Sequence, residues 1–296
     1  MGAWNLDPFI VVPLLAVSLL YARGVAVVWR RAGPGALVSR AQVASFALGI
    51  YVLAVALVSP LDALAHLLFS AHMVQHVLLM LVAAPLLVFG APLMPLLWGL
   101  PRASRLAVGR GWKARPRVRG AWHALTNPVV VWCILTTTLW VWHLPVPYQA
   151  AVTGAGIHAL EHVSMLGASL LFWWVVLQPI GRRRVDGGSA VLLVFATKVQ
   201  AATLGALITF VPIPLYPVYE AGAAAYGMTL MQDQHLAGLI MGTVGGLVYL
   251  FTGAVIFLSW LRGIERRGRP PGASSTERYV RGPRLDVAAI GRGRDA

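Results

Sequence analysis

Seven long apolar stretches constrain the fold of this chain more than any other feature of its sequence. A helix that crosses the roughly 30 Å of a bilayer's hydrocarbon core needs about 17 to 25 apolar residues. Stretches of this kind occupy residues 8–29, 43–60, 72–98, 128–144, 158–179, 189–211 and 235–261. Only 11% of the residues are charged, against about 25% in soluble domains. We therefore expect an all-α, polytopic membrane protein with seven transmembrane helices, contained in residues 1–262.

The positions of Lys and Arg predict how these helices are oriented. All but one of the 24 basic residues fall in four segments, which are residues 23–40, 102–119, 182–184 and 262–296. Cytoplasmic loops of membrane proteins carry such an excess of Lys and Arg. We expect the N-terminus to lie outside and the C-terminus to lie in the cytoplasm. The remaining cation, Lys198, lies inside the sixth stretch and is expected to extend toward the inner headgroups or to pair with a carbonyl group.

Two basic segments on the predicted cytoplasmic side, the loop 99–127 and the tail 263–296, are rich in Arg, Gly and Pro. We expect the tail to be disordered, and both segments to be mobile or to lie against the anionic lipid of the inner leaflet. The net charge of +14 also raises nucleic-acid binding as an alternative. Because no binding motif or interleaved aromatic residues accompany the basic residues, we expect no nucleic-acid partner.

Seven of the eight histidines fall at the predicted outer ends of the spans, and only His123 lies on the cytoplasmic side. Two pairs are spaced four residues apart, which places both imidazoles of a pair on one face of a helix. These pairs open the third and fifth stretches, and a related pattern, Met-Gln-Asp-Gln-His, opens the seventh. We expect a metal site where these three spans meet. Its predicted ligands are His72, His76, His158, His162 and His235.

Other side chains near these histidines are expected to complete the site. A histidine ligand usually donates its second ring N–H to a carboxylate, carbonyl or other acceptor. The acceptors that we expect are Gln75, Glu161, Asp233 and Gln234, and the neighbouring or gating groups are His66, His143, Met73 and Met231. The single cysteine, Cys133, lies within an apolar stretch, so no thiolate site is expected. Imidazole with thioether suits copper, and leaves zinc and iron as alternatives.

Other interpretations of the histidines remain open at the level of sequence. They could form interhelical hydrogen bonds without a metal. Haem could be ligated between facing helices, by His76 with His162 or by His72 with His158. The segment His158-Ala-Leu-Glu161-His162 also matches the H-x-x-E-H pattern of one group of zinc proteases. A metal transporter would need polar groups across the whole membrane, and the inner halves of the third, fifth and seventh stretches offer almost none.

Several blocks of the sequence resemble a known family. They are Ser59-Pro60-Leu61, Ser70-Ala71-His72-Met73-Val74-Gln75-His76, Ala84-Pro85, Phe89-Gly90-Ala91-Pro92, Glu161-His162 and Asp233-Gln234. Over residues 43–250 the chain resembles the multispan CtaG-type assembly factors of haem-copper cytochrome c oxidases. The chain departs from the family pattern after Met241, where it reads Gly-Thr-Val-Gly-Gly, and at His235, where the family often has Gln.

The resemblance implies a multi-pass protein of the bacterial plasma membrane that is needed to build active oxidase, with haem-copper oxidase subunits as its partners. It also implies that copper is held or delivered on the outer side. We therefore expect an assembly factor that is not an enzyme, with copper bound by the histidines and with zinc or haem as alternatives. A haem-b-binding membrane oxidoreductase and a metal transporter are the competing functions.

Overall fold

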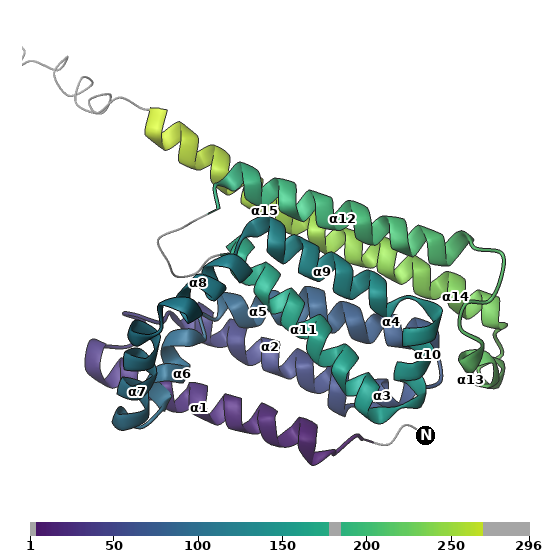
Figure 1. Cartoon of the computed structure of the whole chain (residues 1–296), viewed down its shortest axis with the longest axis horizontal. Helices are drawn as coiled ribbons and strands as arrows, with labels where there is room; N and C mark the ends of the chain where they lie inside the picture. The colour runs from purple at the N-terminus through teal and green to yellow at the C-terminus, as the bar shows by residue number, and fades with distance from the viewer. Residues whose placement is uncertain (1–3, 178–184, 269–296) are drawn as a thin grey trace, which may run out of the picture.

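The computed structural model describes residues 4–177 and 185–268, and the regular secondary structure in this part of the chain is entirely helical (Figure 1). The long helices are α1 (Pro8–Ala32), α2 (Arg40–Val58), α4 (Phe69–Val77) with η1 (Leu78–Ala83) and α5 (Ala84–Phe89), α9 (Pro128–Trp142), α11 (Ala155–Leu177), α12 (Gly187–Phe210), and α14 (Leu230–Leu239) with η3 (Ile240–Val244) and α15 (Gly245–Gly268). Six of these are long and apolar enough to cross a membrane. The shorter α9 makes a seventh span if it is joined to α8 (Pro116–Leu125), from which it is bent by 66°. The chain is therefore a multi-pass membrane protein.

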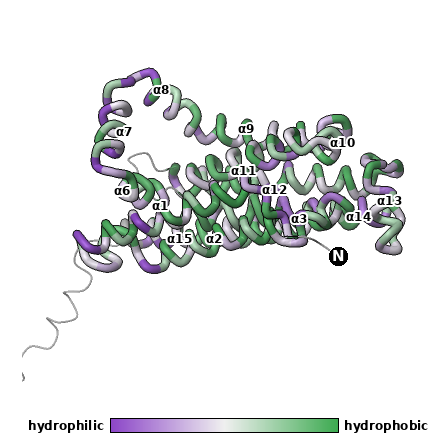
Figure 2. The backbone as a smooth tube through the Cα atoms, turned by 90° about the horizontal axis from the view of Figure 1, so that it is seen from below, coloured by the Kyte–Doolittle hydropathy of each residue, from purple (hydrophilic) through white to green (hydrophobic). Residues whose placement is uncertain are grey.

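The short helices gather at two ends of the bundle (Figure 1). The end that we call the histidine end carries α3 (Pro60–Ala65), α10 (Pro145–Thr153), η2 (Pro217–Tyr219) and α13 (Glu220–Ala225). The opposite end, called the basic end, carries α6 (Leu93–Gly99), α7 (Arg102–Ala114) and α8. Figure 2 shows hydrophilic stretches in α7 and α8 and a largely hydrophobic bundle between the two ends.

The basic loop predicted at residues 99–127 forms the helices α7 and α8, which bury no side chain. The guanidinium of Arg105 lies 4.1 Å from the centre of the Trp98 ring, so a cation–π contact joins α7 to α6. At the other end of the chain, α15 continues to Gly268, so the first residues of the predicted tail are helical. Residues 269–296 of that tail, and the predicted basic cluster at 182–184, lie outside the described residues.

Side-chain caps mark the starts of several long helices. Asp7 and Asn127 each accept a hydrogen bond from a backbone N–H in the first turn of α1 and α9. Pro128 is then the first helical residue of α9, where the N–H that proline lacks would have no intrahelical acceptor. Ser39 and Thr229 begin α2 and α14 with capping boxes. These residue types are the preferred N-caps, so the starts follow from the local sequence.

The third span changes its hydrogen-bond pattern just before Pro85. Residues Leu78–Ala83 form a π-helix, in which each N–H bonds the carbonyl five residues earlier. Pro85 has no N–H and cannot bond the carbonyl of Met80. The indole N–H of Trp173 on α11 donates to that carbonyl instead, at 2.9 Å. The helix ends at Phe89, so the predicted stretch 72–98 contains one long helix and the separate short helix α6.

The histidine-bearing helices α4 and α11 lie at the centre of the bundle. The third span is 61% buried and α11 is 50% buried, against 17% for α1 and 28% or less for the other candidate spans. The third span packs against α2, α11 and α14. Polar side chains on these two helices are therefore shielded from lipid, where an ionisable group would be costly.

Two helix pairs approach each other closely at glycines. A Cβ atom on Gly24 of α1 would overlap the carbonyl oxygen of Pro95 in α6, and one on Gly238 of α14 would lie 2.7 Å from the carbonyl oxygen of Gly205 in α12. Small residues commonly permit such contacts between membrane helices. With α14 seated on both α12 and α4, the last span reaches the centre of the bundle.

Candidate metal centre

The two histidine pairs face each other between α4 and α11. The ring centre of His72 lies 5.5 Å from that of His158 and 5.9 Å from that of His162. The ring centre of His76 also lies 5.5 Å from that of His162. The structure thus brings the four paired histidines together, although they come from segments more than 80 residues apart.

Glu161 extends from α11 into this group of imidazoles. Its carboxylate oxygens lie 3.6 Å from Nε2 of His72 and 3.7 Å from Nε2 of His76. One ligand atom from each of His72, His158, Glu161 and His162 lies within 4.8 Å of the others. The Nε2 atoms of His72 and His76 are 2.9 Å apart. With metal–nitrogen bonds of about 2.0–2.1 Å, two ligands of a tetrahedral ion lie about 3.3 Å apart. We call these five residues the His–Glu site.

The His–Glu site is buried and short of hydrogen-bond partners. Glu161 is 0% exposed, and His72, His76 and His158 are 1%, 4% and 9% exposed. Both carboxylate oxygens of Glu161 and the Nε2 atoms of His158 and His162 have no hydrogen-bond partner among the described residues. Buried polar atoms in proteins are nearly always paired. Unpaired imidazole nitrogens around a carboxylate are therefore suited to bind a cation as ligands.

Tyrosines close the His–Glu site at the histidine end. The hydroxyl of Tyr219 lies 3.3 Å from Nδ1 of His72 and 3.0 Å from the hydroxyl of Tyr148. The Tyr216 hydroxyl donates a hydrogen bond of 2.7 Å to the backbone carbonyl of His143. These tyrosines lie outside the spanning helices, and burial raises the pKa of each well above its usual value near 10. Their hydroxyls therefore stay protonated and neutral at physiological pH.

His143 and His66 lie beside the site rather than within it. His143 ends α9, is buried, and has its ring centre 6.1 Å from that of His76. His66 ends α3 and is exposed, with its ring centre 4.8 Å from that of His158. Both histidines lie next to the site without entering it, and the neighbouring or gating role that the sequence suggested for either stays a prediction.

His235 does not join the other histidines, so the expectation that the seventh span supplies a ligand is corrected. On α14 the side chains of Asp233 and Gln234 are buried, whereas His235 is exposed. An α-helix turns by about 100° per residue, so two consecutive inward residues direct the next one away. Met231, one turn before His235, is half-buried, and a neighbouring role for it stays a prediction.

Three of the four acceptors that the sequence suggested are engaged elsewhere. The amide of Gln75 donates to a carboxylate oxygen of Asp62 at 2.9 Å. The carboxylate of Asp233 accepts from the backbone N–H of Phe69 at 2.7 Å. The amide oxygen of Gln234 accepts a backbone N–H of the preceding loop at 2.7 Å. These contacts tie helices and loops together, and the expectation that these residues orient the histidines is corrected. Of the four, Glu161 alone meets the imidazoles.

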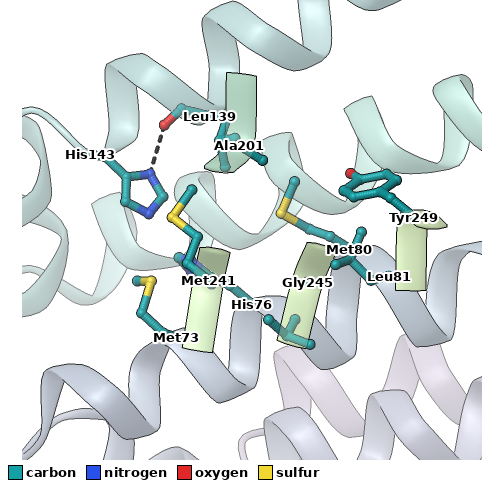
Figure 3. A pocket seen from close by; sticks show the side chains of 11 residues that line it. Met73, His76, Met80, Leu81, Leu139, His143, Ala201, Met241, Gly245 and Tyr249 are labelled. Carbon is teal, nitrogen blue, oxygen red and sulfur yellow. Dashed lines mark hydrogen bonds between the residues drawn. The ribbon is translucent and has the colours of Figure 1, made fainter. Parts of the chain in front are cut away.

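Met73 faces a cavity that adjoins the His–Glu site. Met80 and Met241 line the same cavity, and Figure 3 shows all three sulfur atoms turned into the space between the helices. Met80 and Met241 are not among the site residues that the sequence predicted. A signal for Met80 was available, because Met73, His76 and Met80 follow the three- and four-residue spacing of one helix face.

Comparison with known proteins places the chain in a family. A model of the family described as "Cytochrome c oxidase caa3 assembly factor" matches residues 19–263. The chain belongs to this family. The match contains every residue of the His–Glu site, and the resemblance to CtaG-type assembly factors is confirmed.

Individual relatives of this caa3 assembly factor family member include two mycobacterial proteins. They are "Uncharacterized protein Mb0105" of Mycobacterium bovis and "Uncharacterized protein MT0111" of Mycobacterium tuberculosis. Each is 24% identical over 274 residues, which make up 90% of this chain. The chain spans 40% of the length of these relatives. No solved structure matches the chain.

Proposed function

We propose that this member of the caa3 assembly factor family binds copper at the His–Glu site and supplies it to a haem-copper oxidase subunit during assembly. The observation that carries the proposal is the buried carboxylate of Glu161 among four imidazoles. A carboxylate without hydrogen-bond partners in a buried place is costly, and a bound cation offsets that cost. The proposed role is non-enzymatic, because a cargo ion is bound and released without a change in covalent bonds.

The ligand chemistry favours copper over other metals. Imidazole suits copper, zinc, iron and nickel, whereas thioethers select the softer Cu(I). The His–Glu site offers imidazole and one carboxylate. Met73, Met80 and Met241 line the adjoining cavity together with His76. Zinc is the second candidate, since a site of histidines and one carboxylate also satisfies it.

The packing of the imidazoles speaks against haem. A haem ligated by two histidines needs them on opposite faces of a flat macrocycle. Here the rings of His72 and His76 are in edge contact, with centres 4.3 Å apart, and those of His158 and His162 are 4.2 Å apart. The carboxylate of Glu161 occupies the space between the pairs. Burial of Glu161 beneath the tyrosines also speaks against a protease that must admit a peptide.

A holding or delivering role is favoured over transport through the membrane. Deeper in the bundle, toward the basic end, the centre is filled by the buried rings of Phe172, Trp173 and Tyr249. Trp173 stacks on Tyr249 with ring centres 5.9 Å apart. A transporter would need a polar path at this depth, and these side chains pack against one another instead.

We infer that the histidine end faces the outside of a bacterial plasma membrane and the basic end the cytoplasm, as the distribution of Lys and Arg suggests. Single cysteines in a Cys133→Ala background test this orientation. An impermeant thiol reagent applied to intact cells is expected to label Ala224→Cys, at the histidine end, and to spare Ala114→Cys, at the basic end. Both positions are exposed. Labelling of Ala114→Cys from outside would reverse the proposed topology.

The copper proposal is tested in cells whose oxidase depends on this chain. In a strain carrying His76→Ala/His162→Ala, the oxidase is expected to contain its subunits and haem but to lack copper, with activity lost in proportion. Excess copper in the medium is expected to restore part of the activity by mass action. His123→Ala, an exposed histidine at the basic end, is the matched control and is expected to leave copper content unchanged. Normal copper content in the double variant would refute the proposal.

A further inference from the structure

A cavity lies beside the His–Glu site, between the third span, α9, α12 and the last span. Its volume is about 40 Å³, where a single water needs about 10–15 Å³ on the same measure. Its walls include Met73, Met80 and Met241 together with the imidazoles of His76 and His143. We call these five residues the methionine pocket. The pocket has room for one metal ion together with a water molecule.

His143 offers the methionine pocket a nitrogen with a free lone pair. Its Nδ1 lies 2.7 Å from the backbone carbonyl oxygen of Leu139. A carbonyl oxygen can only accept, so Nδ1 carries the proton and the neutral ring presents a lone pair at Nε2. His143 is 5% exposed, and its Nε2 has no hydrogen-bond partner among the described residues. Figure 3 shows this imidazole beside the methionine sulfurs. The buried lone pair of His143 Nε2 is therefore available to bind a metal ion.

The ligands of the methionine pocket are soft and uncharged. Met73, Met80 and Met241 are 1%, 6% and 8% exposed, so their thioethers are withdrawn from solvent and lipid. Among the residues that the structure describes, no carboxylate lines the cavity. Thioethers select Cu(I) over harder cations. A neutral ligand set in a buried place also favours a monovalent ion over a divalent one, since a smaller charge loses less hydration energy.

Methionines in a core usually fill irregular gaps. In the methionine pocket three of them surround a cavity without filling it. The imidazole of His143 there is already held in the tautomer that presents Nε2 as a ligand. The pocket is also next to the His–Glu site, because His76 belongs to both and separates them. Packing explains neither the remaining cavity nor the unpaired nitrogen of His143.

We propose that the methionine pocket is a second metal site, which binds one soft monovalent cation, Cu(I) in the cell, through the sulfur atoms of Met73 and Met241 and Nε2 of His143. Met80 completes the soft lining. The inference goes beyond the function proposed for the His–Glu site and does not depend on it. The two sites differ in chemistry, since one holds a carboxylate and the other holds thioethers.

Silver(I), which is a redox-inert stand-in for Cu(I), tests the second site in purified full-length protein in detergent. In a background of His158→Ala/Glu161→Gln, which disables the His–Glu site, one equivalent of silver(I) is expected to remain bound. Adding Met73→Leu/Met241→Leu, which nearly conserves volume, is expected to weaken silver(I) binding by more than about 100-fold. Substitutions of residues that only contact metal ligands typically weaken binding by about 10- to 100-fold, so a larger loss indicates that ligands were removed. The control Met231→Leu, outside the pocket, is expected to bind as the background does.

Zinc(II) affinity distinguishes the His–Glu site from the methionine pocket. The affinity of zinc(II) for the wild-type protein is expected to fall with His158→Ala/Glu161→Gln and to be unchanged by Met73→Leu/Met241→Leu. Unchanged silver(I) affinity in the methionine variant would overturn the second site and leave the His–Glu site intact. X-ray absorption of the Cu(I)-loaded His158→Ala/Glu161→Gln protein tests the second site directly, even if the methionine variant does not fold. Sulfur neighbours around copper are expected, and a spectrum with only nitrogen and oxygen neighbours would also overturn it.

Discussion

The carboxylate of Asp233 on α14 holds the first turn of α4, where it accepts hydrogen bonds from the backbone N–H groups of Phe69 at 2.7 Å and Ser70 at 3.0 Å. Leu68, which precedes this turn, provides no capping side chain. A residue of the last span thus caps the third span from across the bundle. His72 begins the next turn of α4, so the position of the His–Glu site depends on this contact.

Replacing Asp233 is expected to destabilise the protein. Asp233→Ala leaves two buried N–H groups unpaired, which we expect to cost about 1–3 kcal/mol in a denaturant titration in detergent. Asp186→Ala is the matched control, since Asp186 accepts the backbone N–H of Ser189 at the exposed start of α12, and its loss is expected to be smaller. A loss for Asp233→Ala no larger than for the control would contradict the capping role.

A double-mutant cycle tests why the third span contains a π-helix. Trp173→Phe leaves the buried carbonyl of Met80 unpaired and is expected to cost about 1–3 kcal/mol. Pro85→Ala supplies a backbone N–H that can reach the same carbonyl, so the double variant is expected to lose less than the two single losses combined, by about 0.5 kcal/mol or more. Trp140→Phe removes an indole bond to Gln200 instead, and is expected to be additive with Pro85→Ala. Additivity in both pairs would contradict this account.

Replacing His158 and replacing His235 are expected to affect metal affinity differently, although the sequence predicted both residues as ligands. His158→Ala removes a buried ligand and is expected to weaken copper(II) or zinc(II) binding by more than about 100-fold. His235→Ala changes an exposed side chain and is expected to leave metal affinity unchanged and stability within about 0.5 kcal/mol. Competition with a chromophoric chelator measures both affinities. Equal losses for the two variants would place His235 in the site.

Glu161→Gln is expected to have opposite effects in the presence and absence of metal. Without metal, the change removes a carboxylate that lacks hydrogen-bond partners, and the amide can donate to the Nε2 atoms nearby. We expect the free energy of unfolding to rise by about 1 kcal/mol. The increase in melting temperature on adding copper or zinc is expected to shrink, since stabilisation by a bound ligand grows with the logarithm of its affinity. The exposed Glu220→Gln is expected to change neither quantity. The proposed role would be contradicted if the Glu161→Gln protein were less stable than wild type without metal and if its melting temperature rose as much as that of wild type on adding metal.

Much of the His–Glu site follows from the sequence. The four-residue spacing of His72 with His76 and of His158 with His162 places each pair on one helix face, whatever the helices pack against. That these helices are the most buried was not predictable from hydropathy, because every stretch is similarly apolar. The facing of the two pairs, with Glu161 between them, was therefore a hypothesis until the helices were placed.

Two features of the last span explain where the structure departs from the sequence predictions. The repeated pattern that ends in His235 suggested a third ligand helix, but the rotation of α14 is set by Asp233, which reaches the N–H of Phe69 on another span. Met241 lies within η3, a π-helical segment of the last span. Each extra residue in a π-turn rotates the following helix by about 100°. A periodicity read along the sequence cannot be carried through such a segment.

The sequence by itself determined the helical class, the approximate spans, the caps at Asn127 and Thr229, and the two histidine pairs, because each depends on residues within a few positions of one another. The tertiary structure alone decided that Glu161 enters the histidine group, that His235 stays outside it, and that Met73 and Met241 share a cavity with His143. These relationships depend on the rotation and contact of helices distant in sequence. That rotation is set by buried hydrogen bonds and by close packing at small residues, which the local sequence does not specify.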